Sequence, residues 1–153
     1  MTTIRLLSPL AGVLRPVTAV PDPVFAEGIV GPGVAIEPQH VQTQTVVAPA
    51  DGVVGALHPH AFALELGEGR TILVHLGIDT VGLAGQGFTL HVDGGQGVRA
   101  GDRLITWSPV DVGAAGLATI CPVVALQADP GALSVLVPDG DAVDAGQPLL
   151  DWA

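Results

Sequence analysis

Glycine and proline recur so closely along this chain that no long helix fits between them. The 153 residues include 21 Gly and 13 Pro, and one or the other interrupts nearly every window long enough for a stable helix. At most one or two helical turns fit, around 78–83, 109–115 and 129–136. Strand-sized apolar segments are frequent, which predicts an all-β protein. They are 3–7, 12–17, 33–37, 43–48, 52–57, 60–66, 71–76, 88–92, 103–107, 121–127 and 148–152.

Two segments of the chain are repeated. "SPLAGVLRPV" at 8–17 is similar to "APADGVVGAL" at 48–57, and "GQGVRAGDRLITW" at 95–107 matches "GDAVDAGQPLLDW" at 140–152 at identical offsets. Duplicated structural units explain such echoes, so we expect a twofold-related sandwich formed by residues 1–153 as a single domain. Trp107 and Trp152, which end the second pair of segments, are expected to be packing residues.

The charge of the chain excludes several functions. Its five basic residues are all Arg and face fifteen Asp and Glu, for a formal net charge of −10. Such a field repels nucleic acids and anionic membranes. Without lysine, neither a P-loop nor a Schiff-base mechanism is available.

The cellular location is predicted from the absence of a membrane-spanning segment and of a secretory signal. No apolar run reaches the roughly 18 to 20 residues that span a bilayer, and the N-terminus lacks the apolar segment of a secretory signal. We therefore expect a cytoplasmic protein without direct membrane insertion. Cys121 has no partner for an intramolecular disulfide and is expected to be a small buried residue.

Three of the five histidines lie in one apolar stretch, "HPHAFALELGEGRTILVHLGIDTV" at 58–81. Its segments 60–66 and 71–76 predict a hairpin around the Gly-rich "GEGR". With an even loop, Leu66 lies opposite Thr71, and Phe62 lies opposite His75. His60 then shares a face with His75, one diagonal step and roughly 7 Å away. An odd loop would place the two on opposite faces.

A pair of imidazoles on one face suits phosphoryl transfer or metal binding. A neutral imidazole is a nucleophile, so His75 could attack phosphorus while His60 neutralises the charge of the phosphoryl oxygens. Asp79 could orient or polarise the site, or simply cap an exposed turn. His58 precedes Pro59 at the predicted start of a strand and has no assigned role.

The segments "VHLGIDTV" and "HAFAL", whose histidines are fifteen residues apart, strongly resemble the glucose-type IIA component of the bacterial phosphoenolpyruvate-dependent sugar phosphotransferase system. "SPLAGVL", "PDPVFAEGIVGPGVAIEP", "VVAPADGVV", "GQGVRAGDRLITW" and "CPVVAL" look like further segments of that family, in its order. The resemblance implies a flattened antiparallel β-sandwich with a duplicated hybrid motif. It also implies that His75 accepts a phosphoryl group from the carrier protein HPr and passes it to a cysteine of a IIB domain, supported by His60.

The resemblance further implies a shallow apolar docking depression around the histidines and no required cofactor. The residues placed near this surface are Asp22, Val24, Phe25, Ile29 and Val30. Some relatives also bind regulatory targets. The chain departs from the family where His58 replaces a common Thr and Gly28 a frequent Lys. The sugar, whether glucose, N-acetylglucosamine or another, is not decided by this part of the system.

Two other functions compete with phosphoryl transfer. The HxH form of residues 58–60 and the HxxxD form of residues 75–79 occur as zinc ligands in lysostaphin-like peptidases, where three His and one Asp would suit tetrahedral zinc. Their order is reversed here, and the surrounding sequence resembles the phosphocarrier family. A purely regulatory binding protein is the other alternative. Adventitious zinc binding by His60 and His75 is compatible with either reading.

Overall fold

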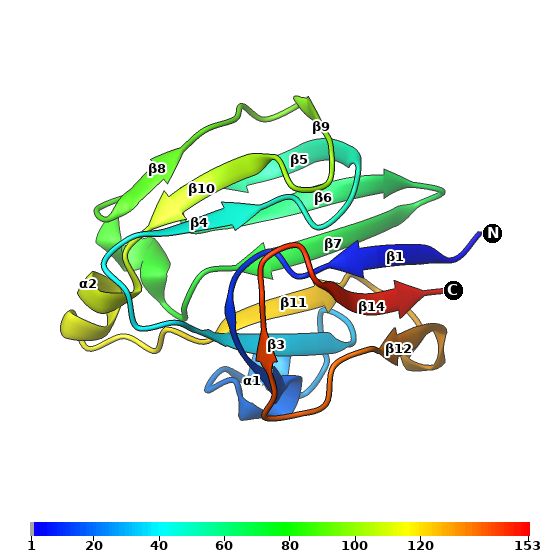
Figure 1. Cartoon of the computed structure of the whole chain (residues 1–153), viewed down its shortest axis with the longest axis horizontal. Helices are drawn as coiled ribbons and strands as arrows, with labels where there is room; N and C mark the ends of the chain where they lie inside the picture. The colour runs from blue at the N-terminus through cyan, green and yellow to red at the C-terminus, as the bar shows by residue number, and fades with distance from the viewer. Residues whose placement is uncertain (1) are drawn as a thin grey trace.

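The computed structural model describes residues 2–153, which form three antiparallel sheets (Figure 1). The strands are β1 (Ile4–Leu7), β2 (Gly12–Pro16), β3 (Gly33–Pro38), β4 (Gln44–Val47), β5 (Gly52–His58), β6 (Ala61–Gly67), β7 (Arg70–His75), β8 (Phe88–Leu90), β9 (Gly97–Val98), β10 (Arg103–Trp107), β11 (Cys121–Ala125), β12 (Leu133–Val135), β13 (Ala142–Val143) and β14 (Pro148–Trp152). The short helices are α1 (Pro23–Ala26) and α2 (Pro109–Ala114), with 3-10 turns η1 (Val17–Ala19), η2 (Thr80–Leu83) and η3 (Pro130–Ala132). The prediction of an all-β fold is confirmed.

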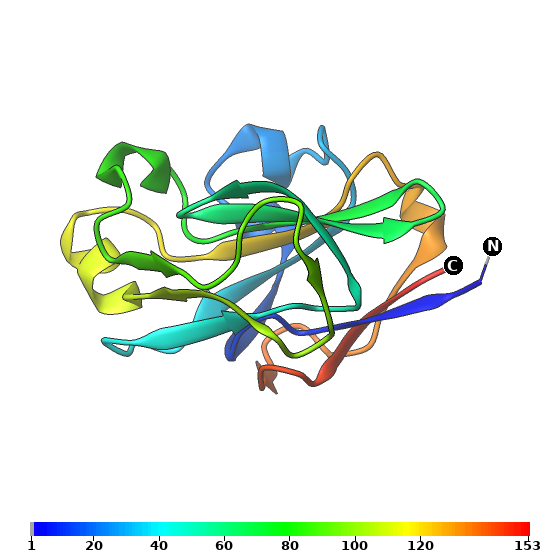
Figure 2. The same cartoon turned by 90° about the horizontal axis from the view of Figure 1, so that it is seen from above.

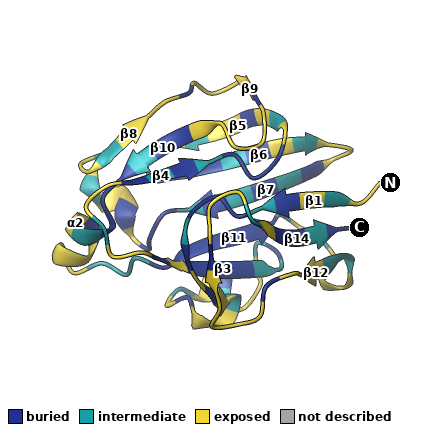
Figure 3. Cartoon of the chain, in the orientation of Figure 1, coloured by how far each residue is buried: buried dark blue, intermediate teal, exposed yellow. Residues whose placement is uncertain are grey.

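The sheets pack as two layers (Figure 2). The largest sheet has the order β13-β2-β3-β11-β7-β6-β5-β9, and the two smaller ones have the orders β1-β14-β12 and β4-β10-β8. The main hydrophobic core is built from strands of all three sheets, and buried residues lie mostly along the strands while many connecting segments are exposed (Figure 3). Within residues 2–153, no helix is long and apolar enough to cross a membrane.

The structure confirms the internal duplication. β1 and β2 correspond to β4 and β5 at an offset of 40 residues, while β8, β9 and β10 correspond to β12, β13 and β14 at an offset of 45. Equivalent strands make equivalent pairs: β1 pairs with β14 as β4 does with β10, and β2 pairs with β13 as β5 does with β9. The copies meet through reciprocal hydrogen bonds of 2.8 Å, from Leu7 to Pro49 and from Val47 to Pro9. The repeated segments therefore form equivalent structural units, and each unit hydrogen-bonds to the other.

The residues expected to pack inside the sandwich do so. Trp107 and Trp152 are buried, and the Trp107 indole donates a hydrogen bond to the Gln44 side chain at 3.0 Å. Cys121 is also fully buried.

A second, smaller core lies on the other face of the large sheet. It contains Val20, Phe25, Ala35, Ile78, Ile120 and Val124. Ala35 and Val124 alternate along β3 and β11 with residues of the main core, so their side chains point away from it. Helix α1 covers this face through Phe25, which belongs to the second core. The helical turn forms because Asp22 caps it, accepting a hydrogen bond from the Val24 amide at 2.9 Å, and Pro23 follows the cap. This one-turn helix is too short for apolar periodicity to predict it.

One further element was predicted wrongly. The segment 129–136 was expected to form helical turns, but only η3 is helical and β12 follows it directly. β12 forms because it pairs with β14, a partner that is distant in the sequence. Tertiary pairing therefore overrides the local preference.

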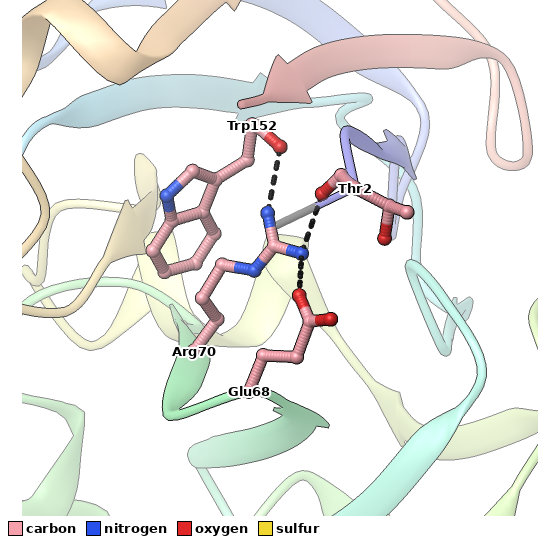
Figure 4. A network of polar contacts seen from close by, with 4 residues as sticks. All are labelled: Thr2, Glu68, Arg70 and Trp152. Atoms are coloured by element: carbon pink, nitrogen blue, oxygen red, sulfur yellow. Dashed lines mark hydrogen bonds and ion pairs between the residues drawn. The ribbon is translucent and has the colours of Figure 1, made fainter.

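The two ends of the chain are joined through a buried arginine on the β6–β7 hairpin (Figure 4). Arg70, which is 4% exposed, donates hydrogen bonds to the Trp152 carbonyl at 2.9 Å and the Thr2 carbonyl at 2.6 Å. It also pairs with Glu68 at 2.8 Å, and its guanidinium lies 5.7 Å from the centre of the Trp152 ring. Its Nε is the one buried side-chain nitrogen or oxygen in residues 2–153 without a hydrogen-bond partner. The Arg70 guanidinium thus fastens the first and last strands to the hairpin.

Candidate functional site

Three imidazole rings gather where strands β5, β6 and β7 meet. His58 ends β5, His75 ends β7, and His60 lies in the turn between β5 and β6. The His60 and His75 rings are 5.1 Å apart between centroids and meet edge to face. The His58 and His60 rings are stacked at 5.6 Å. The predicted proximity of His60 and His75 is therefore observed.

The register that was predicted to bring them together is wrong. Ala61, and not Phe62, lies opposite His75. The turn is even, with Glu68 and Gly69 at positive φ as a tight hairpin requires, but the pairing shifts between Glu65 and Gly67. This bulge adds one residue to β6 and moves every later pair by one position. His60 consequently reaches His75 from a turn and not by strand alternation.

The His75 ring is oriented by the backbone that follows it. Its Nδ1 lies 2.5 Å from the Gly77 carbonyl oxygen. Since a carbonyl can only accept, Nδ1 carries the proton, and in the neutral ring the lone pair is on Nε2. Gly77 has a φ of +71°, and a Cβ there would lie 2.8 Å from the Ala118 carbonyl oxygen, so glycine is required at this position. The sequence "HLGID" therefore holds the nucleophilic tautomer of His75.

The environment keeps both rings neutral near pH 7. Burial is the main cause that lowers the pKa of His75, opposed by the Gly77 hydrogen bond and by the carboxylates of Asp22 and Asp79. Burial also lowers the pKa of His60, with further lowering from the charges of His75 and His58. A neutral ring keeps the lone pair that nucleophilic attack requires.

We expect His75 to titrate below pH 6.5 in the folded protein, as measured from its ring proton resonances in an NMR pH series. Because the unfolded chain holds the proton up to about pH 6.5, it binds more protons than the folded state just below that pH. The protein therefore has its full stability, as far as His75 and His60 affect it, above pH 6.5. The free energy of unfolding falls as the pH drops below 6.5 and through the lowered pKa values of these two residues. The urea-unfolded protein is the reference, and a His75 midpoint above that reference would contradict the expectation.

The residues expected at a docking surface differ in burial and in their relation to His75. The Phe25 ring lies 5.6 Å from the His75 ring and is only 8% exposed, so it supports the imidazole from the second core. Val24 and Ile29 are 42% and 64% exposed, while Val30 is half-buried against the second core. Asp22 acts on His75 through its charge and also caps α1.

Two further residues lie on or before η2, and the second of them was not predicted. Asp79 is exposed at a φ of 62° before η2, and its side chain makes no capping hydrogen bond. The charge of its carboxylate raises the pKa of His75. Val81, two residues later and 68% exposed, was not singled out. A lone valine after a Thr carries no sequence signal, and only its place in η2 leaves it in solvent.

The zinc alternative is not supported. Within residues 2–153, no group of three or more His, Cys, Asp or Glu side chains is arranged to hold a metal ion. His58, which would be a ligand of the HxH motif, stacks against His60. The three-histidine, one-aspartate ligand set suggested by the two motifs is therefore not assembled.

Comparisons with known proteins give a consistent picture. The family model "phosphoenolpyruvate-dependent sugar phosphotransferase system, EIIA 1" matches residues 4–131. The glucose- and mannose-specific EIIBCA components of Corynebacterium glutamicum are 47% and 49% identical over 82% and 79% of this chain. The chain spans only 18% of the length of either relative.

A shorter relative and a solved structure also match. The glucose-specific EIIA component of Bacillus cereus is 40% identical over 81% of this chain and 74% of its own length. The glucose permease IIA from Mycoplasma capricolum has a similar fold, with a TM-score of 0.86 and 29% identity over 99% of this chain and 96% of that one.

Proposed function

Because the chain belongs to the EIIA 1 family of the phosphoenolpyruvate-dependent sugar phosphotransferase system, we propose that it is a phosphocarrier for sugar uptake that carries the phosphoryl group on His75. The observation that carries this proposal is the hydrogen bond from His75 Nδ1 to the Gly77 carbonyl oxygen, which leaves Nε2 as the nucleophile beside His60. The partially buried, neutral imidazole is ready to attack without first losing a proton.

The proposed step moves one phosphoryl group between nitrogens. His75 Nε2 attacks the phosphorus of phospho-HPr, a new N–P bond forms, and the N–P bond of the donor breaks. The Nδ1 proton remains in its hydrogen bond to the Gly77 carbonyl oxygen, and this hydrogen bond stabilises the phosphorylated ring. His60 lies where it can donate a hydrogen bond to the phosphoryl oxygens as their charge shifts. In the onward step, a cysteine thiolate of a IIB domain takes the group and His75 Nε2 recovers its lone pair.

HPr and the IIB domain would both dock on the rim around His75. We expect this rim to consist of the apolar side chains of Val24, Ile29 and Val81, which are exposed, with Val30, which packs against the second core. One rim can serve both partners, because the phosphoryl group must face the donor first and the acceptor afterwards. Apolar contact around the imidazole also excludes water from a labile N–P bond.

The sugar and the setting follow from the partners. Relatives specific for glucose and for mannose match this chain almost equally well, so the sugar, N-acetylglucosamine included, would be chosen by the membrane IIC domain. Acceptance from phospho-HPr places the chain in the cytoplasm. The step needs no cofactor, since the phosphoryl group arrives on its donor, and zinc at His60 and His75 would be adventitious.

Incubation with labelled phosphoenolpyruvate, enzyme I and HPr tests the proposal. We expect the chain to take up one phosphoryl group that is labile in acid and stable in base, as a phosphohistidine is. Omission of HPr is the control and should prevent the uptake. No uptake, or an acid-stable phosphate, would overturn the proposal.

His60→Gln should separate acceptance from onward transfer. We expect uptake from phospho-HPr to persist, because the nucleophile and its tautomer are unchanged, and transfer to the IIB domain to slow by about 100-fold, because a positioned donor to the phosphoryl group is lost. Rapid-quench measurement of each half-reaction checks both. His40→Gln, outside the ring cluster, is the matched control. Equal loss in both half-reactions would show that the two histidines do not divide the work in this way.

A further inference from the structure

His58 is the member of the ring cluster to which the proposed transfer assigns no role. It lies directly opposite Ala61, which in turn lies opposite His75. Directly paired residues place their side chains on the same face of a sheet, so His58 and His75 share the face on which partners would dock. The His60 ring contacts both, stacked on His58 and edge-on to His75.

A phosphoryl group on His75 would bring about two negative charges to this face. The acidic groups that act on His75 are Asp22 and Asp79, and they oppose an added anion. The chain has no lysine. Arg5 is paired with Asp151 on another sheet, Arg103 begins β10 of the third sheet, and Arg70 lies at the far end of β7, roughly 16 Å away along the strand. Arg99 follows β9 at the end of β5 opposite to His58. Arg15 is exposed on the second-core face of β2, but β3 and β11 separate it from β7, a distance of roughly 14 Å across the sheet. The imidazoles of the ring cluster are therefore the basic groups nearest to the phosphoryl group.

The other charged groups around His58 are few. Strand β9, on one side of β5, carries no titratable residue, and on the other side Glu65 of β6 lies beside Gly55. His91 and Asp93 line a shallow cleft next to Leu57. The charges that act on His60 and His75 come from Asp22, Asp79 and the other imidazoles of the cluster. Among these groups, His60 stacks on His58, and His75 contacts the His60 ring.

We propose that His58 and His60 act as a stacked pair that takes up a proton from solvent when His75 is phosphorylated. Before phosphorylation, a positive charge on one stacked ring opposes charge on the other, and partial burial opposes it further at His60. A phosphoryl dianion reverses this balance, since it attracts a proton to either ring. His58, which is exposed, meets a smaller desolvation cost than His60 and acts through it as a positioning residue. The uptake presupposes the proposed phosphorylation of His75, and it leaves the N–P exchange itself unchanged.

NMR pH titration of the assigned histidine ring protons, in the free and the phosphorylated protein, tests the pair. We expect the midpoints of His58 and His60 to rise by about half to one pH unit on phosphorylation, and that of His40 to stay in place. Acid-labile label measured on the same sample establishes phosphorylation independently. A labelled protein whose His58 midpoint does not rise overturns the stacked pair but not the carrier function, whereas an unlabelled protein overturns both.

His58→Phe keeps a ring against His60 but cannot bind a proton. In the unphosphorylated variant we expect the pH midpoint of His60 to rise, because a neighbouring like charge is removed. In the phosphorylated variant His60 is the only ring of the stacked pair that can still bind a proton. His58→Ala, which removes the ring as well, should raise the His60 midpoint in the same way. If neither variant moves the His60 midpoint, the two rings do not share charge and the proposal is wrong.

Discussion

His75→Gln is expected to abolish phosphoryl uptake from phospho-HPr, with a loss of at least about 1,000-fold. Glutamine is close to histidine in size and polarity, and its amide can still contact the Gly77 carbonyl, but an amide nitrogen has no free lone pair with which to attack phosphorus. The His75 ring is half-buried beside Phe25, so the variant should fold with little loss of packing. The measurement is acid-labile label per chain over time, with phospho-HPr in excess.

His91→Gln is the matched control for this result. His91 is exposed and its Nε2 contacts the Thr106 hydroxyl at 2.7 Å, outside the ring cluster. It should leave uptake unchanged. If His75→Gln still acquires acid-labile phosphate at a rate near wild type, then another nitrogen is the acceptor, and His60 is the first to test.

Arg70→Met is expected to lower the free energy of unfolding by roughly 2–3 kcal/mol. Methionine preserves most of the buried volume and relieves the Nε that lacks a partner, but it leaves the Trp152 and Thr2 carbonyls without their donors. The ion pair itself adds little to this figure, because the Glu68 side chain is 48% exposed and well solvated. Urea denaturation followed by tryptophan fluorescence measures the change, since Trp152 packs on Arg70.

Arg5→Met is the control, because it removes an arginine whose side chain also bonds to the last strand, but at an exposed position on β1. Arg5 bonds to Asp151 in the open, with its side chain 57% exposed, so we expect its unfolding midpoint to match wild type closely. Phosphoryl uptake by the folded fraction should be normal in both variants, since Arg70 lies at the opposite end of β7 from His75. Equal destabilisation by the two substitutions would show that burial of Arg70 contributes nothing.

The sequence predicted a large part of the fold because its signals are local or periodic. Gly and Pro limit helix length wherever they occur, and the repeated segments have equal offsets because they form equivalent strands. The same signals failed for α1 and β12, which are only four and three residues long and so contain too few residues for a pattern to repeat. α1 depends on a cap and β12 on a distant partner strand.

For the site, residue identities were predictable and their arrangement was not. His60 and His75 were recognisable as a pair, but a bulge beside Leu66 shifts the hairpin by one residue and places His60 in a turn. Nothing in an alternating apolar pattern marks where one strand accommodates an extra residue. The Phe25–His75 contact likewise depends on α1 folding back over the large sheet.

The sequence by itself determined the class of fold, its duplication and the chemistry available, since these follow from residue type, spacing and charge. The tertiary structure alone decided which imidazole nitrogen is free, which rings stack and which arginine is buried. Those properties depend on distances of a few ångströms between segments far apart in the chain, and local sequence does not encode such distances. His58 shows the difference most clearly. Its sequence context assigned it no role, whereas its stacking on His60 is the basis for proposing that the two rings take up a proton together.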